Sequence, residues 1–513
     1  MMPPRLLRLS RFLVLILLVA SPAPAQDTGI VQKLYDNALQ LLRTGKPEEA
    51  LKSFEQIYQS YGKSAQAADA LFQAASYYYP TTDLDDLGLV SRDSIQKAIP
   101  LLDRIRRDYG TSSRAPEALY RLGLLALEPE NPRANPDEAY AAFTSVANVY
   151  PNSSLVGPAL FGAAVSQMRS GAFGTAIEDF SRLLEQFPDI PAAPRARLAF
   201  GYCQFRAGDF PRAMEEYQKV RDFFPSRPEA KVALERLTLL HRLRLNPSVG
   251  RIVSYELDPT FPGKLQLLGA KSLVSMAVDP DGNLLVGDAR GGGAIKVDPT
   301  GKVIGRLVLL DLQAVASDWR GNAALAGGGI MLLGTRQFAL VRPDASSSRP
   351  VKDVGALAVD RDGRILVADE KAGEILLYGR DLSFKGSLHR TASGRLSAVQ
   401  VSFDNQVYVL DSKEKSINVY SDGKLLSRLR LDEPPASIAL PVDLAVDDLG
   451  DLYIVDDAGS RVVVLDPTGK RVLSTLISGK TKGGLTDPQR VGVDRQGRIY
   501  VYDRKADAVL RFH

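Results

Sequence analysis

Acidic residues at a repeated spacing are the first candidates for chemistry in this chain of 513 residues. Asp279, Asp281 and Asn283 carry the kind of side-chain oxygen that binds calcium, and the same Asp-x-x-Gly unit returns at Asp360 and Asp447. A tight turn needs the same residues, because Asp accepts hydrogen bonds from its own backbone and Gly tolerates positive φ. We interpret these carboxylates as turn-forming, with calcium as the alternative, and expect no cofactor. The second-strand aspartates take the same interpretation: Asp288, Asp369, Asp411, Asp456 and Asp503.

Histidine and cysteine are scarce. The three histidines, His241, His389 and His513, are expected in a capping helix, in a loop and at the C-terminus. No Gly-x-Ser-x-Gly elbow, Walker loop or His-Glu-x-x-His motif is present. The single cysteine, Cys203, cannot close an intramolecular disulfide and is expected as a small buried residue of a helix. The sequence therefore predicts a protein that is not an enzyme.

The acidic turns belong to a strand repeat in the C-terminal half. In four copies an apolar strand ends in Asp, a turn follows, and a second apolar strand ends in Asp. Two copies are degenerate: one ends in Gly327, and the other begins at Ser402 and has Asn405 where Gly would stand. The six copies are 276–288, 318–327, 357–369, 402–411, 444–456 and 491–503. Copies about 40 residues apart predict a ring of small sheets, which we place at residues 251–513. The last copy lacks a fourth strand, and because 262–269 resembles 300–307 we predict that it closes the ring.

Basic residues recur at one position of this repeat. Two residues after the second Asp position the copies carry Arg290, Gly329, Lys371, Lys413, Ala458 and Lys505. These loops emerge on one face, so repetition gives a ring of positive charge. We predict that Arg290, Lys371, Lys413, Arg461 and Lys505 form a binding face for an anionic partner, with ordinary solvated surface as the alternative. Trp319, on the opposite-face loop, is expected either to pack or to anchor a ligand.

A second repeat occupies residues 29–245. An Ala is followed by an aromatic residue or Leu, and then by a helix-ending Pro or Gly, at constant offsets. The five copies are Ala50/Phe54/Gly62, Ala98/Leu102/Gly110, Ala139/Phe143/Pro151, Ala176/Phe180/Pro188 and Ala213/Tyr217/Pro225. Gly45, Gly171 and Gly208 stand five residues before an Ala, where paired helices would turn. This pattern predicts an all-α solenoid, with 227–245 as its capping helix and 246–250 as a linker.

The N-terminus carries the features of an export signal. Arg5, Arg8 and Arg11 precede an apolar run at 12–20, about half of the roughly 20 residues that span a bilayer. Small residues at 23–25 predict cleavage after Ala25, so that residues 1–25 form a signal peptide. An uncleaved anchor is the alternative. We expect a periplasmic protein, or else a secreted one. The formal charge of +4, from 64 basic and 60 acidic residues, points to no particular partner.

The helical array resembles the tetratricopeptide repeat (TPR), and its long spacing is similar to that of TPR proteins of the bacterial envelope. The strand copies resemble NHL repeats, which form six-bladed propellers. The two resemblances imply an exported bacterial TPR–NHL protein, in which an all-α TPR solenoid precedes an all-β six-bladed propeller.

The expected function is a non-catalytic scaffold that joins a TPR groove to an NHL propeller face. Its expected partners are proteins, an anionic envelope component and no nucleic acid. One alternative is a propeller lyase or hydrolase acting on an envelope glycan or peptide, although propeller lyases similar to the NHL family use several inward-facing histidines. The other alternative is a structural spacer.

Overall fold

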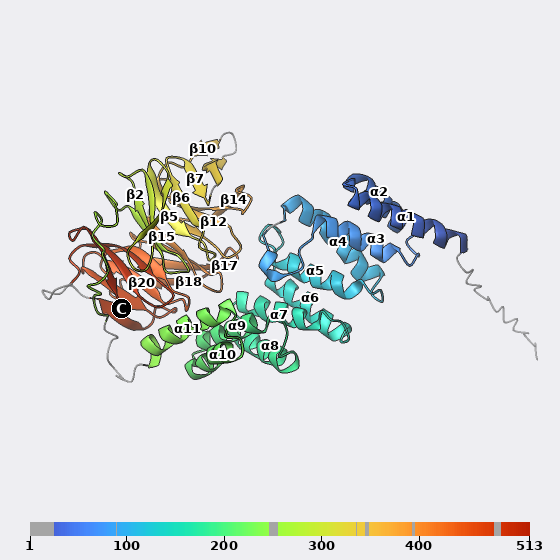
Figure 1. The fold of residues 1–513 in the computed structure, drawn as a ribbon, viewed down its shortest axis with the longest axis horizontal. Coiled ribbons are helices and arrows are strands. Elements are labelled where there is room, and N and C mark those ends of the chain that lie inside the picture. Colours follow the sequence, from blue (N-terminus) through green and yellow to red (C-terminus); the bar gives the residue numbers. More distant parts are fainter. Residues whose placement is uncertain are drawn as a thin grey trace, which may run out of the picture. The chain divides into compact units, whose positions relative to one another are not determined.

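The computed structural model describes residues 25–88, 90–245, 255–334, 336–343, 348–391, 395–476 and 484–513 (Figure 1). The predicted linker and, apart from Ala25, the predicted signal peptide lie outside these residues. One compact unit ends at Tyr77, and the second runs from Tyr78 to His513. The second unit contains helices from α4 onward and the whole of the described β structure. No described helix is both long and apolar enough to cross a bilayer.

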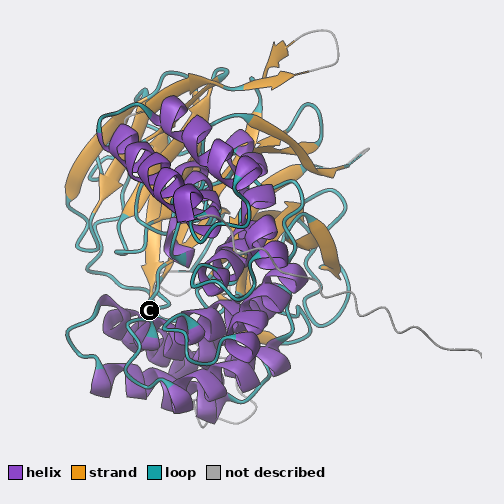
Figure 2. Cartoon of the chain, turned by 90° about the vertical axis from the view of Figure 1, so that its right-hand side faces the viewer, coloured by secondary structure: helices purple, strands orange, loops and turns teal. Residues whose placement is uncertain are grey.

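Helices occupy the N-terminal part of the described chain (Figures 1 and 2). The α-helices are α1 Ala25–Arg43, α2 Pro47–Ser60, α3 Ala67–Tyr78, α4 Arg92–Asp108, α5 Ala115–Leu127, α6 Pro136–Val149, α7 Val156–Arg169, α8 Phe173–Gln186, α9 Ala193–Arg206, α10 Phe210–Phe223 and α11 Pro228–Leu240. A 3-10 turn, η1 Leu84–Asp86, lies between α3 and α4, and a π-helical turn, η2 His241–Leu245, follows α11. The predicted helical repeat region is therefore confirmed, and α11 lies within residues 227–245, where the capping helix was predicted.

The repeated Ala and aromatic positions lie in the second helix of each pair. All ten of these side chains, from Ala50 to Tyr217, are completely buried. In α5 and α7, Gly123 and Gly162 both face Phe143, and an added Cβ would lie 2.6 and 2.8 Å from its ring. The absence of side chains at these glycines lets the aromatic ring of one pair fill the gap between neighbouring first helices. This packing explains why aromatic residues recur at this position.

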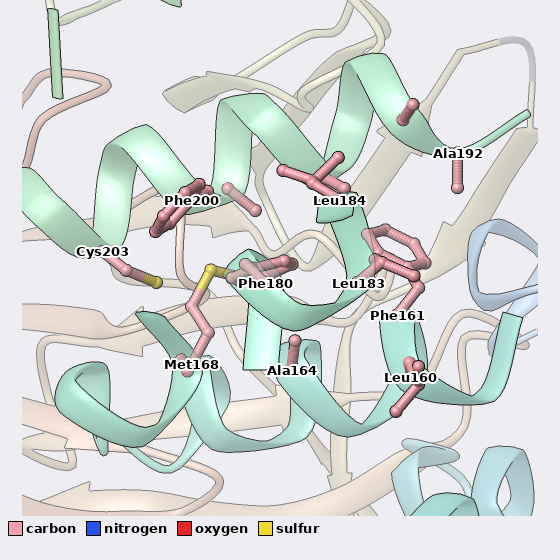
Figure 3. Packing of buried hydrophobic residues seen from close by; sticks show 14 of the residues in the cluster. Leu160, Phe161, Ala164, Met168, Phe180, Leu183, Leu184, Ala192, Phe200 and Cys203 are labelled. Carbon is pink, nitrogen blue, oxygen red and sulfur yellow. The ribbon is translucent and has the colours of Figure 1, made fainter. Parts of the chain in front are cut away.

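The helix cluster around α7, α8 and α9 shows this packing (Figure 3). Phe180 of α8 lies between Phe161 of α7 and Phe200 of α9, with both ring centroids 6.3 Å away. Cys203 and Met168 belong to the same cluster, and Cys203 is fully buried (Figure 3). Burial raises the pKa of its thiol, which keeps it protonated and unreactive. The prediction for Cys203 is confirmed.

The β structure consists of six antiparallel blades. Blade one holds β1 Ser275–Val278, β2 Leu284–Asp288, β3 Gly293–Val297 and β4 Val303–Val308. Blade two holds β5 Leu312–Ser317, β6 Ala323–Gly327, β7 Ile330–Leu333 and β8 Arg336–Ala339. Blade three holds β11 Val354–Val359, β12 Ile365–Asp369, β13 Glu374–Tyr378 and β14 Phe384–Arg390.

Blade four holds β15 Leu396–Val401, β16 Val407–Asp411, β17 Ser416–Ser421 and β18 Lys424–Arg430. Blade five holds β19 Pro441–Val446, β20 Leu452–Asp456, β21 Arg461–Leu465 and β22 Val472–Leu476. Blade six holds β23 Pro488–Val493, β24 Ile499–Asp503 and β25 Ala508–Phe512. A separate hairpin, β9 Val341–Pro343 and β10 Ser348–Pro350, lies between blades two and three. Blade two, degenerate in sequence, is thus complete in structure.

Residues before β1 complete blade six, but not as predicted. Leu257 pairs with Phe512, and Lys264 pairs with Ala508 at the other end of β25. Between the two bridges lie Pro259 and Pro262, which have no N–H to donate, so the edge is interrupted. The predicted closing strand at 262–269 is correct only at 263–265. Residues 266–269 form turns, and residues 256–258 supply the other half of the closure.

The repeated aspartates hold turns together. Asp279 Oδ1 accepts hydrogen bonds from the backbone N–H groups of Asp281 and Asn283, at 3.0 and 2.8 Å. Asp288, at the end of β2, accepts from the N–H groups of Lys271 and Ser272, at 2.7 and 3.0 Å. These bonds are those expected of turn-forming residues. Within the described part of the chain, no cluster of three His, Cys, Asp or Glu side chains could hold a metal ion.

Candidate functional site

Helices α7, α9 and α11 contact the propeller turns that join the first and second strands of the blades. Buried arginines of the helical region pair with aspartates of blades three, four and five. The N···O distances are 2.9 Å for Arg169–Asp362, 2.7 Å for Arg206–Asp404, 3.7 Å for Arg236–Asp448 and 2.5 Å for Arg244–Asp451. Removing one partner of a buried ion pair leaves an uncompensated charge and is strongly destabilising. The pairs therefore determine which helix meets which blade.

Phe403 anchors the same contact. It occupies the second position of the blade-four turn, and its ring centroid lies 5.0 Å from that of Tyr202 in α9. The guanidinium groups of Arg236 and Arg361 lie 3.8 and 4.3 Å from the ring centroid. An aromatic ring between two cations gains both buried apolar area and cation–π attraction. One propeller side chain is thus packed against helices of the solenoid and a turn of blade three.

The contact encloses a cavity of about 790 Å³ within the second unit. Helices α7 and α9 contribute apolar side chains such as Phe161, Val165 and Leu198. Turns of blades two to six contribute the facing wall, including Trp319 and Arg361. The cavity is therefore a composite site, because neither repeat array forms it alone.

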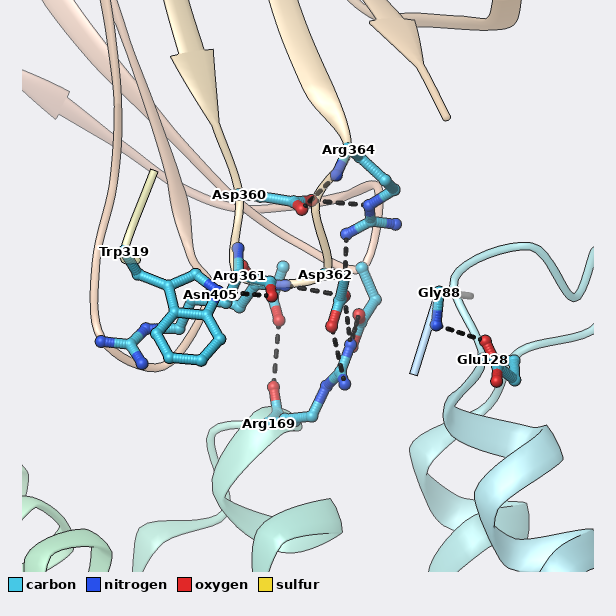
Figure 4. Close-up of polar contacts among 11 residues, drawn as sticks. Gly88, Glu128, Arg169, Trp319, Asp360, Arg361, Asp362, Arg364 and Asn405 are labelled. Atoms are coloured by element: carbon cyan, nitrogen blue, oxygen red, sulfur yellow. Dashed lines mark hydrogen bonds and ion pairs between the residues drawn. The ribbon is translucent and has the colours of Figure 1, made fainter. Parts of the chain in front are cut away.

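Trp319, Arg361 and Phe403 occupy the second position of three successive turns. Hydrogen bonds that involve Trp319, Arg361 and Asn405 tie these turns together (Figure 4). The Trp319 indole N–H donates to the carbonyl oxygen of Arg361 at 3.0 Å. Asn405 takes a φ of 65° and accepts from the Arg361 N–H at 2.9 Å, while its amide donates to Asp362 at 2.9 Å. Trp319 remains 38% exposed and lines the cavity. It can therefore contact a ligand without leaving its place.

Three carboxylates on the propeller side of the cavity are already held by partners. Asp360 pairs with Arg364 at 2.6 Å, and Asp362 pairs with Arg169 and, at 3.5 Å, with Arg364 (Figure 4). Asp318 accepts from the backbone N–H groups of residues 320 and 322, at 2.9 and 2.7 Å. Little acceptor capacity of these groups is left for a ligand.

The arginines at the cavity differ. Among the described residues, no carboxylate lies within ion-pair distance of Arg320, Arg336, Arg361 or Arg380, all of which line it. Burial lowers the pKa of Arg361 to about 10. Asp448 opposes this shift, and Arg236 and Arg495 add to it. Burial also lowers the pKa of Arg380; Arg320 and Arg336 act in the same direction, and Asp318 and Asp86 oppose them. Arg380 is therefore repelled by Arg320 and Arg336, and Arg361 by Arg236 and Arg495.

The residue types that line the cavity limit the chemistry it can offer. Among the described residues that line the cavity there is no His, Cys, Ser, Thr, Lys or Tyr. A guanidinium group is too weak an acid to exchange protons near neutral pH. The cavity thus offers fixed positive charge, an aromatic surface and an aliphatic wall. That combination suits an anionic ligand with an apolar part.

The basic residues predicted from the sequence lie elsewhere. Arg290, Lys371, Lys413 and Lys505 are exposed in the turns between second and third strands, which emerge on the propeller face opposite to the turns of the cavity. Acidic neighbours share these turns, including Glu370, Glu414 and Asp507. That this ring binds an anionic partner stays a prediction.

Arg461 differs from the other members of the ring. Its guanidinium pairs with Asp456 at 2.9 Å and donates to the Ser437 carbonyl oxygen at 2.9 Å. Arg461 therefore fastens its own blade and is less available to a partner.

The histidines do not converge on the cavity. His389 was expected in a loop, but it lies in β14, because the fourth strand of blade three extends to Arg390. Its Nδ1 lies 2.5 Å from the Tyr420 hydroxyl. Burial lowers the pKa of His389. His241 begins η2 and His513 ends the chain, where its backbone pairs with Glu256.

Sequence reasoning singled out Trp319, which lines the cavity, but missed the other residues of the site. The signal that could have found it is the second position of each turn, where five of the six blades carry a large or charged side chain. The six residues at this position are Pro280, Trp319, Arg361, Phe403, Asp448 and Arg495.

Two family models of the tetratricopeptide repeat match the chain, at residues 117–153 and 161–228. No curated protein matches it. Solved structures similar to it include virginiamycin B lyase from Staphylococcus aureus, with 10% identity over 49% of this chain and 82% of that one and a TM-score of 0.35. A gluconolactonase from Xanthomonas campestris is 17% identical over 52% of this chain and 98% of that one, with a TM-score of 0.38.

An auxiliary nutrient binding protein from Bacteroides ovatus is 13% identical over 48% of this chain and 69% of that one, with a TM-score of 0.38. At these scores the similarities carry no conclusion about activity. The helical repeats matched by the family models and the blade topology together define the architecture. The chain combines tetratricopeptide repeats with a six-bladed β-propeller.

Proposed function

We propose that this protein is a non-catalytic interaction scaffold in which the solenoid and the propeller jointly hold a partner protein. The supporting observation is the composite cavity, which both arrays line and in which four arginines have no carboxylate partner among the described residues. Repeat arrays commonly bind partners through extended surfaces. A site lined by two such surfaces can bind selectively a partner that is complementary to both.

The remaining parts of the proposal rest on sequence alone. The N-terminal residues support export, with the periplasm as the expected location, and the strand repeat supports kinship with NHL propellers. The solenoid–propeller boundary is placed at 246–250, and independent folding of the two halves is a prediction. The ring of Arg290, Lys371, Lys413 and Lys505 supplies a second surface for an anionic partner.

Affinity capture from a bacterial envelope extract tests this function. Three versions of the full chain serve as bait: the unaltered chain, a cavity variant with Trp319→Ala, and a ring variant in which Arg290, Lys371, Lys413 and Lys505 are all changed to Glu. We expect a partner that the unaltered and ring-variant baits retain and the cavity variant loses. A partner lost only by the ring variant would move the binding site to the opposite face.

Mass spectrometry of the captured partner separates binding from catalysis. After incubation with an excess of the chain, the partner is expected to keep its mass and its covalent structure. Cleavage or modification that depends on the chain would replace the scaffold by an enzyme.

A further inference from the structure

We infer that the cavity receives an acidic peptide segment of the partner, whose carboxylates meet Arg361 and Arg380 while an apolar side chain lies against Trp319. This inference rests on the proposed function, because it names the chemistry by which the scaffold would recognise its partner.

The charge of the site selects the anion. Arg361 and Arg380 project from blade three, and Arg320 and Arg336 come from blade two. Each guanidinium can present two parallel N–H donors to one carboxylate. An anion beside Arg380 would also relieve its repulsion by Arg320 and Arg336, since no carboxylate of the described residues lies within ion-pair distance of these three groups.

The apolar wall selects a peptide over a simple ion. Val165 and Met168 of α7 and Leu198 of α9 line the cavity opposite to the arginines. The exposed part of Trp319 adds a flat aromatic surface. A volume of about 790 Å³ lies in the range of sites that bury an organic ligand or a short peptide rather than a single small anion.

Arg361 is held in position before any ligand arrives. Its backbone N–H and C=O are bonded to Asn405 and Trp319, and its guanidinium stacks on Phe403 at 4.3 Å. A side chain fixed in this way loses little conformational entropy on binding. The ion pairs between helices and turns keep the opposite wall at a fixed distance.

Fluorescence of Trp319 measures binding directly, because it is the only tryptophan of the chain. The probe is a blocked synthetic peptide that alternates Glu with Leu and Phe, and its matched control carries Gln in place of every Glu. We expect the acidic peptide to shift the Trp319 emission in a saturable way that weakens with salt. The Gln peptide is expected to bind at least about tenfold more weakly, because it cannot make charge-assisted bonds.

Variants of the full chain locate the contact. Arg380→Gln is the first variant, since this side chain is only partly buried and its loss leaves the packing intact. Arg361→Met removes the charge but keeps an unbranched chain against Phe403. Each is expected to weaken the acidic peptide about tenfold. Lys371→Gln, on the opposite face, is the matched control and is expected to leave the affinity unchanged.

Several results would overturn the inference. Equal affinity for the Gln peptide, or unchanged affinity in both arginine variants, would remove the anionic recognition. Inorganic phosphate that binds more tightly than the acidic peptide and displaces it would make the site one for small anions. If the peptide fails while capture of a partner still depends on Trp319, the scaffold function stands and only the class of ligand is wrong.

Discussion

Arg206 and Asp404 provide the sharpest perturbation of the contact between solenoid and propeller. Their side chains are 15% and 0% exposed, and their charged atoms lie 2.7 Å apart. Arg206 also donates to the Tyr202 hydroxyl at 2.8 Å and stacks on Phe173 at 4.5 Å. In Arg206→Ala the Asp404 carboxylate would stay buried, and the Ser402 hydroxyl would remain as its side-chain donor among the described residues. We expect a loss of about 3–5 kcal/mol in the free energy of unfolding.

The matched control is an ion pair that crosses the same contact in solvent. Lys231 of α11 and Asp281 of blade one lie 3.2 Å apart, but their side chains are 58% and 71% exposed. Lys231→Ala is expected to cost no more than about 1 kcal/mol. The comparison therefore sets a buried pair with further contacts against a solvent-exposed pair that crosses the same contact.

Urea unfolding followed by far-ultraviolet circular dichroism and by Trp319 fluorescence measures both variants. A double-mutant cycle with Asp404→Asn isolates the pair, and coupling above about 1 kcal/mol is expected for groups in direct contact. Two results would refute the reasoning: a loss in Arg206→Ala as small as that in Lys231→Ala, or additive effects of the two substitutions at the buried pair.

Three further outcomes follow from the structure and the sequence. Burial raises the pKa of Glu128 to about 7, so the folded state keeps a proton that the unfolded state loses near pH 4.5. The free energy of unfolding should therefore fall as the pH rises between these two values. Urea titrations at several pH values should show that Glu128→Gln removes this dependence and is more stable than the unaltered chain at pH 8 by at most about 3 kcal/mol. A propeller fragment starting at Lys271 should melt well below one starting at Gly250, because it lacks the segment that pairs with β25, and equal melting temperatures would contradict this closure. Mass spectrometry of the protein from an envelope fraction should find cleavage after Ala25, whereas an intact N-terminus in the membrane pellet would contradict the signal peptide.

The fold could be predicted because its determinants repeat. The Ala–aromatic pair of which Ala139 and Phe143 are one example recurs because each helix pair packs against its neighbours in the same way. The Asp-x-x-Gly turns recur because each blade needs the same tight connection between its first two strands. The closing segment was predicted only in part. Residues 263–265 resemble the sequence that leads into the fourth strand of blade one. The pairing at Leu257 has no counterpart in other blades, so no sequence repeat indicates it.

The cavity could not be predicted because it depends on residues that do not repeat. Trp319, Arg361 and Phe403 share a turn position but no chemistry, so a search for recurring residues passes over them. The partners of the buried pairs are 193 residues apart for Arg169 and Asp362 and 198 for Arg206 and Asp404. No local pattern indicates which helix face meets which blade. The sequence favoured the opposite face because repeated lysines are easier to recognise than a composite site.

A structure of the chain bound to a captured partner tests the central claim most directly, since that claim assigns the partner to the space between solenoid and propeller. The account predicts a segment of the partner inside the cavity, with a carboxylate bonded to Arg361 or Arg380 and an apolar side chain against Trp319. A partner seated on the exposed ring of Arg290, Lys371, Lys413 and Lys505, with the cavity left empty, would contradict it.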